Sequence, residues 1–308
     1  MSVELARRNK WLIDYQTPTS YHAYCIRNVI YSGVTKYQQI DVVELFDFGK
    51  ALILDGKIQS TLYDEYIYHE CLVHPAMITH PRPRRVCIVG GGEGATAREV
   101  LRHGCVEEVV MIDIDEGVIE VAKKYLPEWH QGAFDDPRLK LVIADGRKYL
   151  EETNEKFDVV IMDVTDPLEG GPAALLYTKQ FYEIVKSRLT EDGILVTQAT
   201  STHFSRYTFV TIYRTIAAVF PIVKAYSVFI WSFDAPWGFV IGSLKYDPLK
   251  LTVDDIERRL KERGVQGLRF YNPRMHFKLF ELPTDVEEAL EKLEVQVATD
   301  ERPVFLPA

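Results

Sequence analysis

The sequence contains 308 residues, of which 47% are hydrophobic, and its formal net charge is −9. This size allows one large domain with a sizeable core plus a smaller domain, and the acidic balance disfavours a nucleic acid partner, whose phosphates are bound by clustered Lys and Arg. The N-terminal MSVELARRNKWLIDY lacks the apolar core of a signal peptide, and no apolar run approaches the roughly 18–20 residues of a membrane span, so we expect a soluble cytoplasmic protein without a membrane partner.

Residues 20–63 predict a small antiparallel β-domain. The segments YHAYCIRNVIYSG, KYQQIDVVELFDFG and KALILDGKIQSTLY are rich in β-forming residues and are punctuated by SG, FG and DG turns. Residues 64–79 then carry a helical period, which HPRPRR breaks. We therefore divide the chain near residue 80, into an N-terminal domain of residues 1–80 with β-strands and a linker helix, and a larger domain of residues 81–308.

The larger domain predicts an α/β fold. Strands and helices alternate over residues 86–198, which is the pattern of right-handed βαβ units in a parallel sheet. The segments IVKAYSVFI and WGFVIGSLK predict an antiparallel hairpin at the sheet edge, and helices are expected over residues 253–263 and 285–293. Earlier helices are predicted to begin near Glu93, Glu116, Gly146, Ala173 and Phe204.

Acidic residues end nearly every strand of this region. EVVMIDID ends in Asp113, LKLVIADG in Asp145 and Gly146, and FDVVIMDVTD in Asp163 and Asp166. Because ligands of open parallel sheets bind just beyond the carboxyl ends of the strands, we expect these carboxylates to converge on one crevice. Two carboxylates in one pocket raise each other's pKa unless cations are present, so Asp163 and Asp166 favour a polycationic substrate. The alternative for Asp166 is a cap of the next helix.

The segment VCIVGGGEGATAREVL, residues 86–101, reads as a strand, a glycine turn and a helix. Glycines such as Gly90 and Gly92 let the backbone approach a ligand closely. Glu93 lies where the pyrophosphate of a dinucleotide would bind, and its carboxylate repels phosphate but attracts an amine or a sulfonium. The turn therefore disfavours a nucleotide phosphate.

Two strand-end residues indicate a nucleoside. Asp113 follows the glycine turn by about twenty residues, the spacing of acids that accept hydrogen bonds from ribose hydroxyls, although a solvated strand-end aspartate is the alternative. Asp145 is positioned to accept a hydrogen bond from an adenine amino group, and Gly146 leaves room for the ring. Together with the glycine turn, they indicate adenosine without phosphates, the S-adenosyl class of ligand.

The remaining polar and aromatic residues give weaker signals. Tyr68 and His69 lie on the linker helix, and no second His or Cys has metal-ligand spacing, so no metal is predicted. The four cysteines show no short-spaced pair and are expected to be free thiols. Trp231, Phe233 and Trp237 form a cluster in sequence, either packing in the core or stacking against ammonium groups.

Long motifs of this sequence resemble the polyamine aminopropyltransferase (spermidine synthase) family: YHECLVHPAMITHP, GGGEGATAREVLRH, IDIDEGVIEVAKKYLPEW, AFDDPRLKLVIADG, and VTDPLEGGP followed by LYTKQFYE. The resemblance runs from Gln38 to VATDERPVF. DPLEGGP and SFDAPWGFV are similar to the branch of thermospermine synthases and thermophile enzymes acting on agmatine or longer acceptors. The resemblance implies a Rossmann-like, class I methyltransferase-type sheet, preceded by a β-domain that forms homodimers or homotetramers and part of the active-site wall.

The same resemblance implies the chemistry. Decarboxylated S-adenosylmethionine, a co-substrate rather than a cofactor, donates an aminopropyl group to a polyamine, and 5′-methylthioadenosine leaves. Asp163 matches the catalytic aspartate. The positions that match the nucleoside site of the donor are Gln38, Asp113, Asp145, Gly146 and Pro172, and Glu93 matches a position that touches the donor's aminopropyl group or the polyamine. The glycine turn adds Gly90 and Gly92 to the expected donor site. Those that match the acceptor site are Tyr68, His69, Glu93, Asp163, Asp166 and Gln198. Trp237, from the aromatic cluster, is expected to contact the acceptor as well.

The sequence also departs from the spermidine synthase pattern. Residues 232–235 are Ser-Phe-Asp-Ala where the family usually has Tyr-Pro-Ser-Gly, whose tyrosine helps to hold putrescine, so putrescine is disfavoured as the preferred acceptor. Spermidine, agmatine and norspermidine stay open. Asp113 stands where many members have Glu, and the loop after Asp166 is two residues longer. The alternatives are a class I methyltransferase that uses ordinary S-adenosylmethionine and a non-catalytic binder with the same fold.

Overall fold

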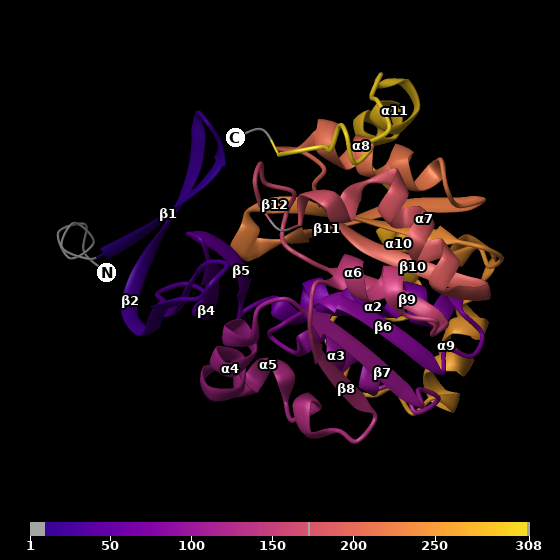
Figure 1. Cartoon of the computed structure of the whole chain (residues 1–308), viewed down its shortest axis with the longest axis horizontal. Helices are drawn as coiled ribbons and strands as arrows, with labels where there is room; N and C mark the ends of the chain where they lie inside the picture. The colour runs from indigo at the N-terminus through magenta and orange to yellow at the C-terminus, as the bar shows by residue number, and fades with distance from the viewer. Residues whose placement is uncertain (1–9, 172, 307–308) are drawn as a thin grey trace.

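The computed structural model describes residues 10–171 and 173–306, which form two β-sheets (Figure 1). The N-terminal sheet is antiparallel, and its five strands follow one another in space as in sequence. It lies to one side of the larger α/β body in Figure 1. Its strands are β1 (Lys10–Thr17), β2 (Ser20–Val34), β3 (Gln39–Leu45), β4 (Gly49–Leu54) and β5 (Lys57–Thr61).

The second sheet has seven strands in the order β11-β12-β10-β9-β6-β7-β8. The five strands from β10 to β8 in this order are parallel, and the β11–β12 hairpin adds to β10 in antiparallel fashion, as the sequence predicts. The strands are β6 (Arg85–Gly90), β7 (Glu108–Asp113), β8 (Leu139–Ile143), β9 (Phe157–Asp163), β10 (Leu189–Ser201), β11 (Ile222–Ile230) and β12 (Ala235–Ser243).

Helices cover both faces of the second sheet. Side chains of β6 alternate between the two faces: Val86 and Ile88 join one buried cluster, and Cys87 and Val89 join the other. Burial on both faces is typical of a parallel sheet. The helices are α2 (Glu65–Thr79), α3 (Ala95–Leu101), α4 (Glu116–Tyr125), α5 (Pro127–His130), α6 (Gly146–Glu152), α7 (Lys179–Arg188), α8 (Arg206–Ala217), α9 (Val253–Glu262), α10 (Pro273–Leu279) and α11 (Thr284–Lys292).

Several predicted boundaries differ from the structure for local reasons. The helix expected near Glu93 begins at Ala95, because Gly94 adopts a left-handed conformation with φ of 82° and ends the turn there. The helix expected near Ala173 is a short 3-10 turn, and α7 begins only after Thr178, whose side chain caps it. The helix expected near Phe204 begins at Arg206. Strand β1 and the short helices α5 and α10 were not predicted; α5, with four residues, is too short to establish a helical period.

Helix α2 connects the two sheets and is buried on all sides, with Tyr66 as its one residue outside the interior. A helix buried all round belongs to the core of a large domain rather than to a surface linker. The N-terminal sheet also packs on α4 and α5, through Val42 and Leu52 on the sheet and Val118 and Trp129 on the helices. These contacts bring the N-terminal sheet over the carboxyl ends of the parallel strands.

The order of the parallel strands reverses between β6 and β9, which are neighbours in space but far apart in sequence. At the end of this pair Gly90 lies opposite Asp163. Such a switch point leaves a crevice for ligands at the carboxyl ends of the strands. No helix of the described residues is long and apolar enough to cross a membrane, and Cys71, Cys87 and Cys105 are free thiols.

Candidate active site

A cleft at this switch point has two chambers with a common wall. The inner chamber contains the ends of β6, β7 and β9, and the outer chamber extends toward the N-terminal sheet. Gln38, Gln59 and Tyr68 line both. Of the residues predicted for the site, the inner chamber also contains Gly90, Gly92, Glu93, Asp113, Asp145, Gly146 and Asp163, and the outer chamber Asp166, Gln198 and Trp237.

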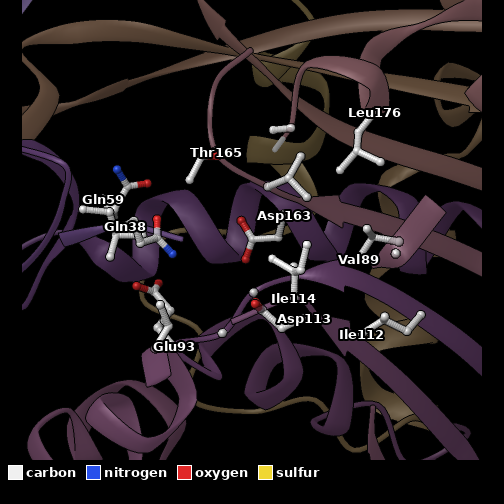
Figure 2. Close-up of a pocket in the computed structure, with 18 of the residues that line it drawn as sticks. Gln38, Gln59, Val89, Glu93, Ile112, Asp113, Ile114, Asp163, Thr165 and Leu176 are labelled. Atoms are coloured by element: carbon white, nitrogen blue, oxygen red, sulfur yellow. The ribbon is translucent and has the colours of Figure 1, made fainter. Parts of the chain in front are cut away.

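The inner chamber has an apolar and a polar end. In Figure 2 the side chains of Val89 and Ile112 lie toward one end, and those of Gln38 and Glu93 lie toward the other. Asp163 lies between the two groups, with its carboxylate directed into the chamber. This division suits a ligand with a flat apolar ring at one end and a cationic chain at the other.

The glycine turn is required by close packing. Gly90 has φ of 81°, and a Cβ atom there would lie 2.2 Å from the carbonyl oxygen of Asp163. At Gly92 a Cβ atom would lie 2.8 Å from the carboxylate of Asp113. Both glycines therefore allow neighbouring strand ends to approach, and Gly92 leaves the Asp113 carboxylate open to the chamber.

Asp113 is held at the end of β7 by the following turn. The backbone N–H of Asp115 donates to Asp113 Oδ1 at 2.9 Å. Burial raises the pKa of Asp113 to about 6, and the nearby carboxylates of Asp115 and Asp163 add to this effect. The side chain of Asp115 in turn accepts a hydrogen bond from Gln38 Nε2 at 2.9 Å. A residue of the N-terminal sheet is thus fixed beside the strand ends.

Asp145 and Gly146 begin helix α6 at the wall of the inner chamber. Asp145 Oδ1 accepts hydrogen bonds from the backbone N–H groups of Arg147 and Lys148, so the residue caps the helix. Its other carboxylate oxygen is available to a ligand, since one carboxylate offers about four acceptor positions. A Cβ atom at Gly146 would lie 2.6 Å from Val89, which explains why this position is glycine.

Asp163 is contacted by two neutral donors. The Tyr68 hydroxyl donates to Oδ1 at 2.9 Å, and the Thr96 hydroxyl donates to Oδ2 at 2.6 Å. Burial raises the pKa of Asp163, and the nearby charge of His69 opposes this. Burial and the adjacent Asp163 carboxylate raise the pKa of Tyr68 well above its usual range, so its hydroxyl keeps its proton.

Glu93 faces the chamber in front of a buried ion-pair network. Its carboxylate lies 2.6 Å from His69 Nε2 and accepts a hydrogen bond from Ser60. On its other side His69 Nδ1 lies 2.9 Å from Glu65, which is paired with Arg98. Burial alone would lower the pKa of His69, but the hydrogen bonds and charges of Glu65 and Glu93 raise it to about 10. His69 is therefore an imidazolium at neutral pH.

The position of His69 differs from the expectation that it contacts the acceptor. Its side chain is only 1% exposed and lines neither chamber, because Glu93 stands between it and the cleft. Of the residues that line the cleft, His69 contacts Glu93.

Asp166 lies in the outer chamber and caps no helix, since the following 3-10 turn and α7 begin at other residues. Gln198 Nε2 donates to Asp166 Oδ1 at 3.1 Å and to the carbonyl oxygen of Val164 at 3.0 Å. Burial raises the pKa of Asp166 to about 6; the Gln198 hydrogen bond and the Lys57 charge lower it, and the Asp14 charge raises it.

The predicted aromatic cluster is only partly observed. Phe233 and Trp237 pack together with ring centroids 4.8 Å apart, and both line the outer chamber. Trp231 is 58% exposed and packs against Phe229 instead. Pro172, which was predicted to contact the nucleoside, lies outside the described residues.

The charges of the cleft are strongly unbalanced. The inner chamber is lined by Glu93, Asp113, Asp145 and Asp163, and among the described residues of both chambers Lys57 alone is basic. No group of three or more His, Cys, Asp or Glu side chains in the described residues has the geometry of a metal site. The cleft therefore favours a cationic ligand.

Sequence reasoning missed several residues that shape this cleft. Asp115 fixes Gln38, Thr96 contacts Asp163, Ser60 contacts Glu93, and Lys57 lines the outer chamber. Asp115 offered one signal, because an aspartate that directly precedes a helix is a typical N-cap. The other contacts join the N-terminal sheet or α3 to distant strand ends, and local sequence patterns do not encode such contacts.

The fold and the cleft define the class of protein: a Rossmann-like α/β protein of the class I methyltransferase type, with an acidic cleft at the carboxyl ends of its parallel strands. Residues 65–250 match the spermine/spermidine synthase domain, and residues 10–61 match the spermidine synthase tetramerisation domain. The chain belongs to the spermine/spermidine synthase family, which confirms the resemblance seen in the motifs.

Individual relatives agree over nearly the whole chain. The polyamine aminopropyltransferase of Sulfurisphaera tokodaii is 52% identical over 298 residues, which cover 97% of this chain and 98% of that protein. The polyamine aminopropyltransferase of Saccharolobus solfataricus is 48% identical over 299 residues with the same coverage.

Two solved structures share the fold. A spermidine synthase in complex with the transition state analogue AdoDATO has a TM-score of 0.87 and 36% identity, covering 93% of this chain and 96% of that chain. The spermidine synthase from Thermotoga maritima has a TM-score of 0.84 and 35% identity, covering 93% and 95%.

Proposed function

We propose that this protein transfers the aminopropyl group of decarboxylated S-adenosylmethionine to a primary amine of agmatine or of a triamine such as spermidine, which would give thermospermine or spermine. Family membership makes the chain an aminopropyltransferase of polyamine biosynthesis. We propose in addition the identity of the donor, the identity of the acceptor and the roles of single residues. The observation that carries it is an inner chamber lined by four carboxylates and, among the described residues, by no Lys or Arg.

The reaction is a single displacement. The neutral acceptor nitrogen attacks the methylene carbon bound to the sulfonium, the carbon–sulfur bond breaks, and its electron pair stays on sulfur as 5′-methylthioadenosine leaves. The new secondary ammonium then gives up one proton. Because an amine with a pKa near 10.4 is protonated at pH 7, presenting it as neutral costs about 4–5 kcal/mol. The protein must supply orientation and favourable charge, and the reaction as proposed requires no cofactor.

Asp163 is the group proposed to act on the reacting nitrogen. A carboxylate is too weak a base to hold an amine proton by itself, so Asp163 orients the nitrogen, stabilises its developing positive charge and passes the proton on. Its hydrogen bonds to Tyr68 and Thr96 support this role, because they fix both oxygens and leave acceptor capacity on each.

The donor residues are proposed on the same basis. Asp113 would accept hydrogen bonds from the ribose hydroxyls, Asp145 would accept one from the adenine amino group, and the glycine turn would lie beneath the sulfonium. Glu93, held by His69 and Ser60, would contact the donor's amine. Asp166, Gln198 and Trp237 would hold the rest of the acceptor in the outer chamber.

The test replaces the proposed catalytic group while keeping its shape. Asp163→Asn should lower kcat at least about a hundredfold, because the neutral amide neither stabilises the ammonium nor takes its proton. Binding of 5′-methylthioadenosine should change by less than about threefold, since this product lacks the aminopropyl chain. Release of methylthioadenosine and product masses are followed with agmatine, putrescine, spermidine and norspermidine. Undiminished turnover by the variant would refute the role of Asp163.

An assay with ordinary S-adenosylmethionine distinguishes the proposed aminopropyltransferase from a methyltransferase. Its additional carboxylate would meet Glu93 and Asp163 in the inner chamber, so we expect no methyl transfer to the same amines. Methylated products formed at a rate comparable to aminopropyl transfer would favour the methyltransferase.

The protein is further proposed to be a cytoplasmic homo-oligomer, either a dimer or a tetramer. Residues 10–61 match a tetramerisation domain, and Tyr15 and Tyr21 on the β1–β2 hairpin are more than half exposed. An edge strand with exposed aromatic residues needs a covering surface. The free thiols of Cys71, Cys87 and Cys105 support a reducing compartment. The molar mass in solution, measured by light scattering, distinguishes monomer, dimer and tetramer.

A further inference from the structure

Lys57 is a basic residue in an otherwise acidic cleft. We propose that Lys57 restricts the acceptor to amines with one cationic group beyond the reacting nitrogen, by occupying Asp14 with its own ammonium. This inference rests on the proposed function and narrows its acceptor from a range of polyamines to agmatine and similar diamines.

The ion pair is part of the wall of the outer chamber. Lys57 Nζ lies 3.0 Å from Asp14 Oδ1, and both side chains line the chamber. Asp14 is only 7% exposed, and its Oδ2 accepts a hydrogen bond from the backbone N–H of Ile58. One face of this carboxylate is therefore fixed by the backbone and the other by the lysine. A substrate ammonium could reach Asp14 only by displacing Lys57.

Asp166 is the second carboxylate that this chamber offers, and it has a neutral partner. Gln198 donates one hydrogen bond to it, and no Lys, Arg or His within ion-pair distance of Asp166 is found among the described residues. The charges of Lys57 and Asp14 both reach Asp166, lowering and raising its pKa respectively, so the three groups share one electrostatic environment. With Asp14 and Lys57 neutralising each other, Asp166 carries the negative charge that is left for a substrate.

Asp55 also borders the outer chamber, but it adds little to the negative charge available to a substrate. Its side chain is exposed at the β4–β5 turn, where it accepts a hydrogen bond from the backbone N–H of Gln39. Water and salt screen an exposed carboxylate, so its attraction for an ammonium is weak.

The count of charges leads to the acceptor class. When its reacting amine is at Asp163, agmatine retains one cation, the guanidinium, which can pair with Asp166. Spermidine retains two cations, and the second would meet the Lys57 ammonium on the wall formed by the N-terminal sheet. Like-charge contact in a partly desolvated site disfavours the longer substrate. The wild-type enzyme should therefore prefer agmatine over spermidine and norspermidine.

The test compares kcat/KM for agmatine and spermidine in wild type and in Lys57→Gln. Removing the ammonium both relieves the repulsion and frees Asp14, so the spermidine-to-agmatine ratio should rise about tenfold, mainly through a lower KM for spermidine. Lys57→Arg retains the charge and should keep the wild-type ratio. Lys292→Gln, on exposed helix α11 and paired with Glu288, is the matched control and should also leave the ratio unchanged.

Two further variants keep the inference falsifiable. Asp14→Asn/Lys57→Gln lacks the freed carboxylate and should lose most of the gain for spermidine. Asp14→Asn alone leaves the lysine uncompensated and should weaken spermidine binding more than agmatine binding, even if Lys57→Gln does not fold. A wild-type enzyme that uses spermidine as well as agmatine, or a ratio that stays within twofold in Lys57→Gln, would overturn the proposal.

Measuring acceptor binding without turnover tests the role of Lys57 independently of the proposed reaction. Titration of agmatine and spermidine into each variant saturated with methylthioadenosine measures the charge effect without turnover. If no acceptor is aminopropylated but the spermidine-to-agmatine affinity ratio still rises in Lys57→Gln, the proposed reaction fails and the role of Lys57 stands. If transfer occurs and neither ratio changes, the role of Lys57 fails alone.

Discussion

Replacing Asp166 by Asn should stabilise the unliganded protein, because the substrate cleft holds this carboxylate in an unfavourable place. Burial raises the pKa of Asp166 from 3.8 to about 6, against the hydrogen bond from Gln198 and the charge of Lys57. A carboxyl group that is a weaker acid in the folded state destabilises that state whenever it is ionised. For these two pKa values the cost is about 3 kcal/mol at pH 7, about 1.5 at pH 5 and about 0.5 at pH 4.

Because the pKa of Asp166 is raised in the folded state, its ionised carboxylate destabilises the protein, and this cost depends on pH. Above pH 6 the full cost is present, and it disappears as the pH falls toward 3.8, where the carboxyl is protonated in both states. Asn has the same shape, and its Oδ1 can still accept the hydrogen bond from Gln198. With an unfolding entropy of about 2.1 cal/mol/K per residue over the 308 residues, about 3 kcal/mol corresponds to a rise in Tm of about 5 °C at pH 7.

Thermal unfolding followed by circular dichroism at pH 7 and pH 4.5 measures the effect. Asp254→Asn, in the exposed first turn of α9 and outside both chambers, is the matched control and should give no stabilisation. Adding agmatine at about a hundred times its Kd should stabilise the wild type by about 2.7 kcal/mol and the variant by less, so the difference in stability between the two proteins should shrink. An Asp166→Asn protein that is equally or less stable at pH 7 without ligand would refute the reasoning.

Two further predictions concern Gly92, in the wall of the inner chamber, and His69, which lies behind that wall. Gly92→Ala adds a Cβ atom 2.8 Å from the Asp113 carboxylate, so it should raise the KM for decarboxylated S-adenosylmethionine about tenfold or more and leave the KM for the acceptor nearly unchanged. Steady-state kinetics with each substrate varied in turn measure both constants. An unchanged KM for the donor would mean that the turn adapts to the added methyl group. His69→Gln removes an imidazolium whose pKa is raised to about 10. In the wild type, the raised pKa stabilises the folded state fully below pH 6.5, and this stabilisation is lost as the pH rises through 10. The variant should lack it. The variant should lose about 4 kcal/mol at pH 7 in urea unfolding, and a loss below about 1 kcal/mol would contradict the assigned charge of His69.

The strand ends of the large sheet were predictable, and the reason is geometric. Parallel strands in βαβ order place their carboxyl ends at one edge, so Asp113, Asp145 and Asp163 converge without any knowledge of side-chain contacts. The orientation of His69 was not predictable in the same way. Its motif predicts a residue near the substrate, but the helical turn that places Tyr68 toward the cleft directs His69 behind Glu93, between two buried carboxylates.

The N-terminal sheet shows which features the sequence did not predict. Its β-character was evident from residues 20–63, but strand β1 was missed, and with it Asp14. The pairing of Asp14 with Lys57 depends on how β1 lies beside β5, two strands that are separated in sequence by most of the sheet. Residues that set the shape of the outer chamber therefore depend on a packing that no local motif describes.

Carboxylates in this cleft fall into two kinds, and the difference decides which substrate charges are recognised. Glu93 and Asp14 each have a cation of the protein itself, His69 and Lys57. Among the described residues, Asp163 and Asp166 accept side-chain hydrogen bonds from hydroxyl or amide donors only, and burial raises the pKa of each. A paired carboxylate gains little from a second cation, whereas one held by neutral donors gains both a counter-charge and relief from its desolvation. The number of cations that the cleft selects should therefore follow the carboxylates without an internal partner, and not the total acidity of the chain.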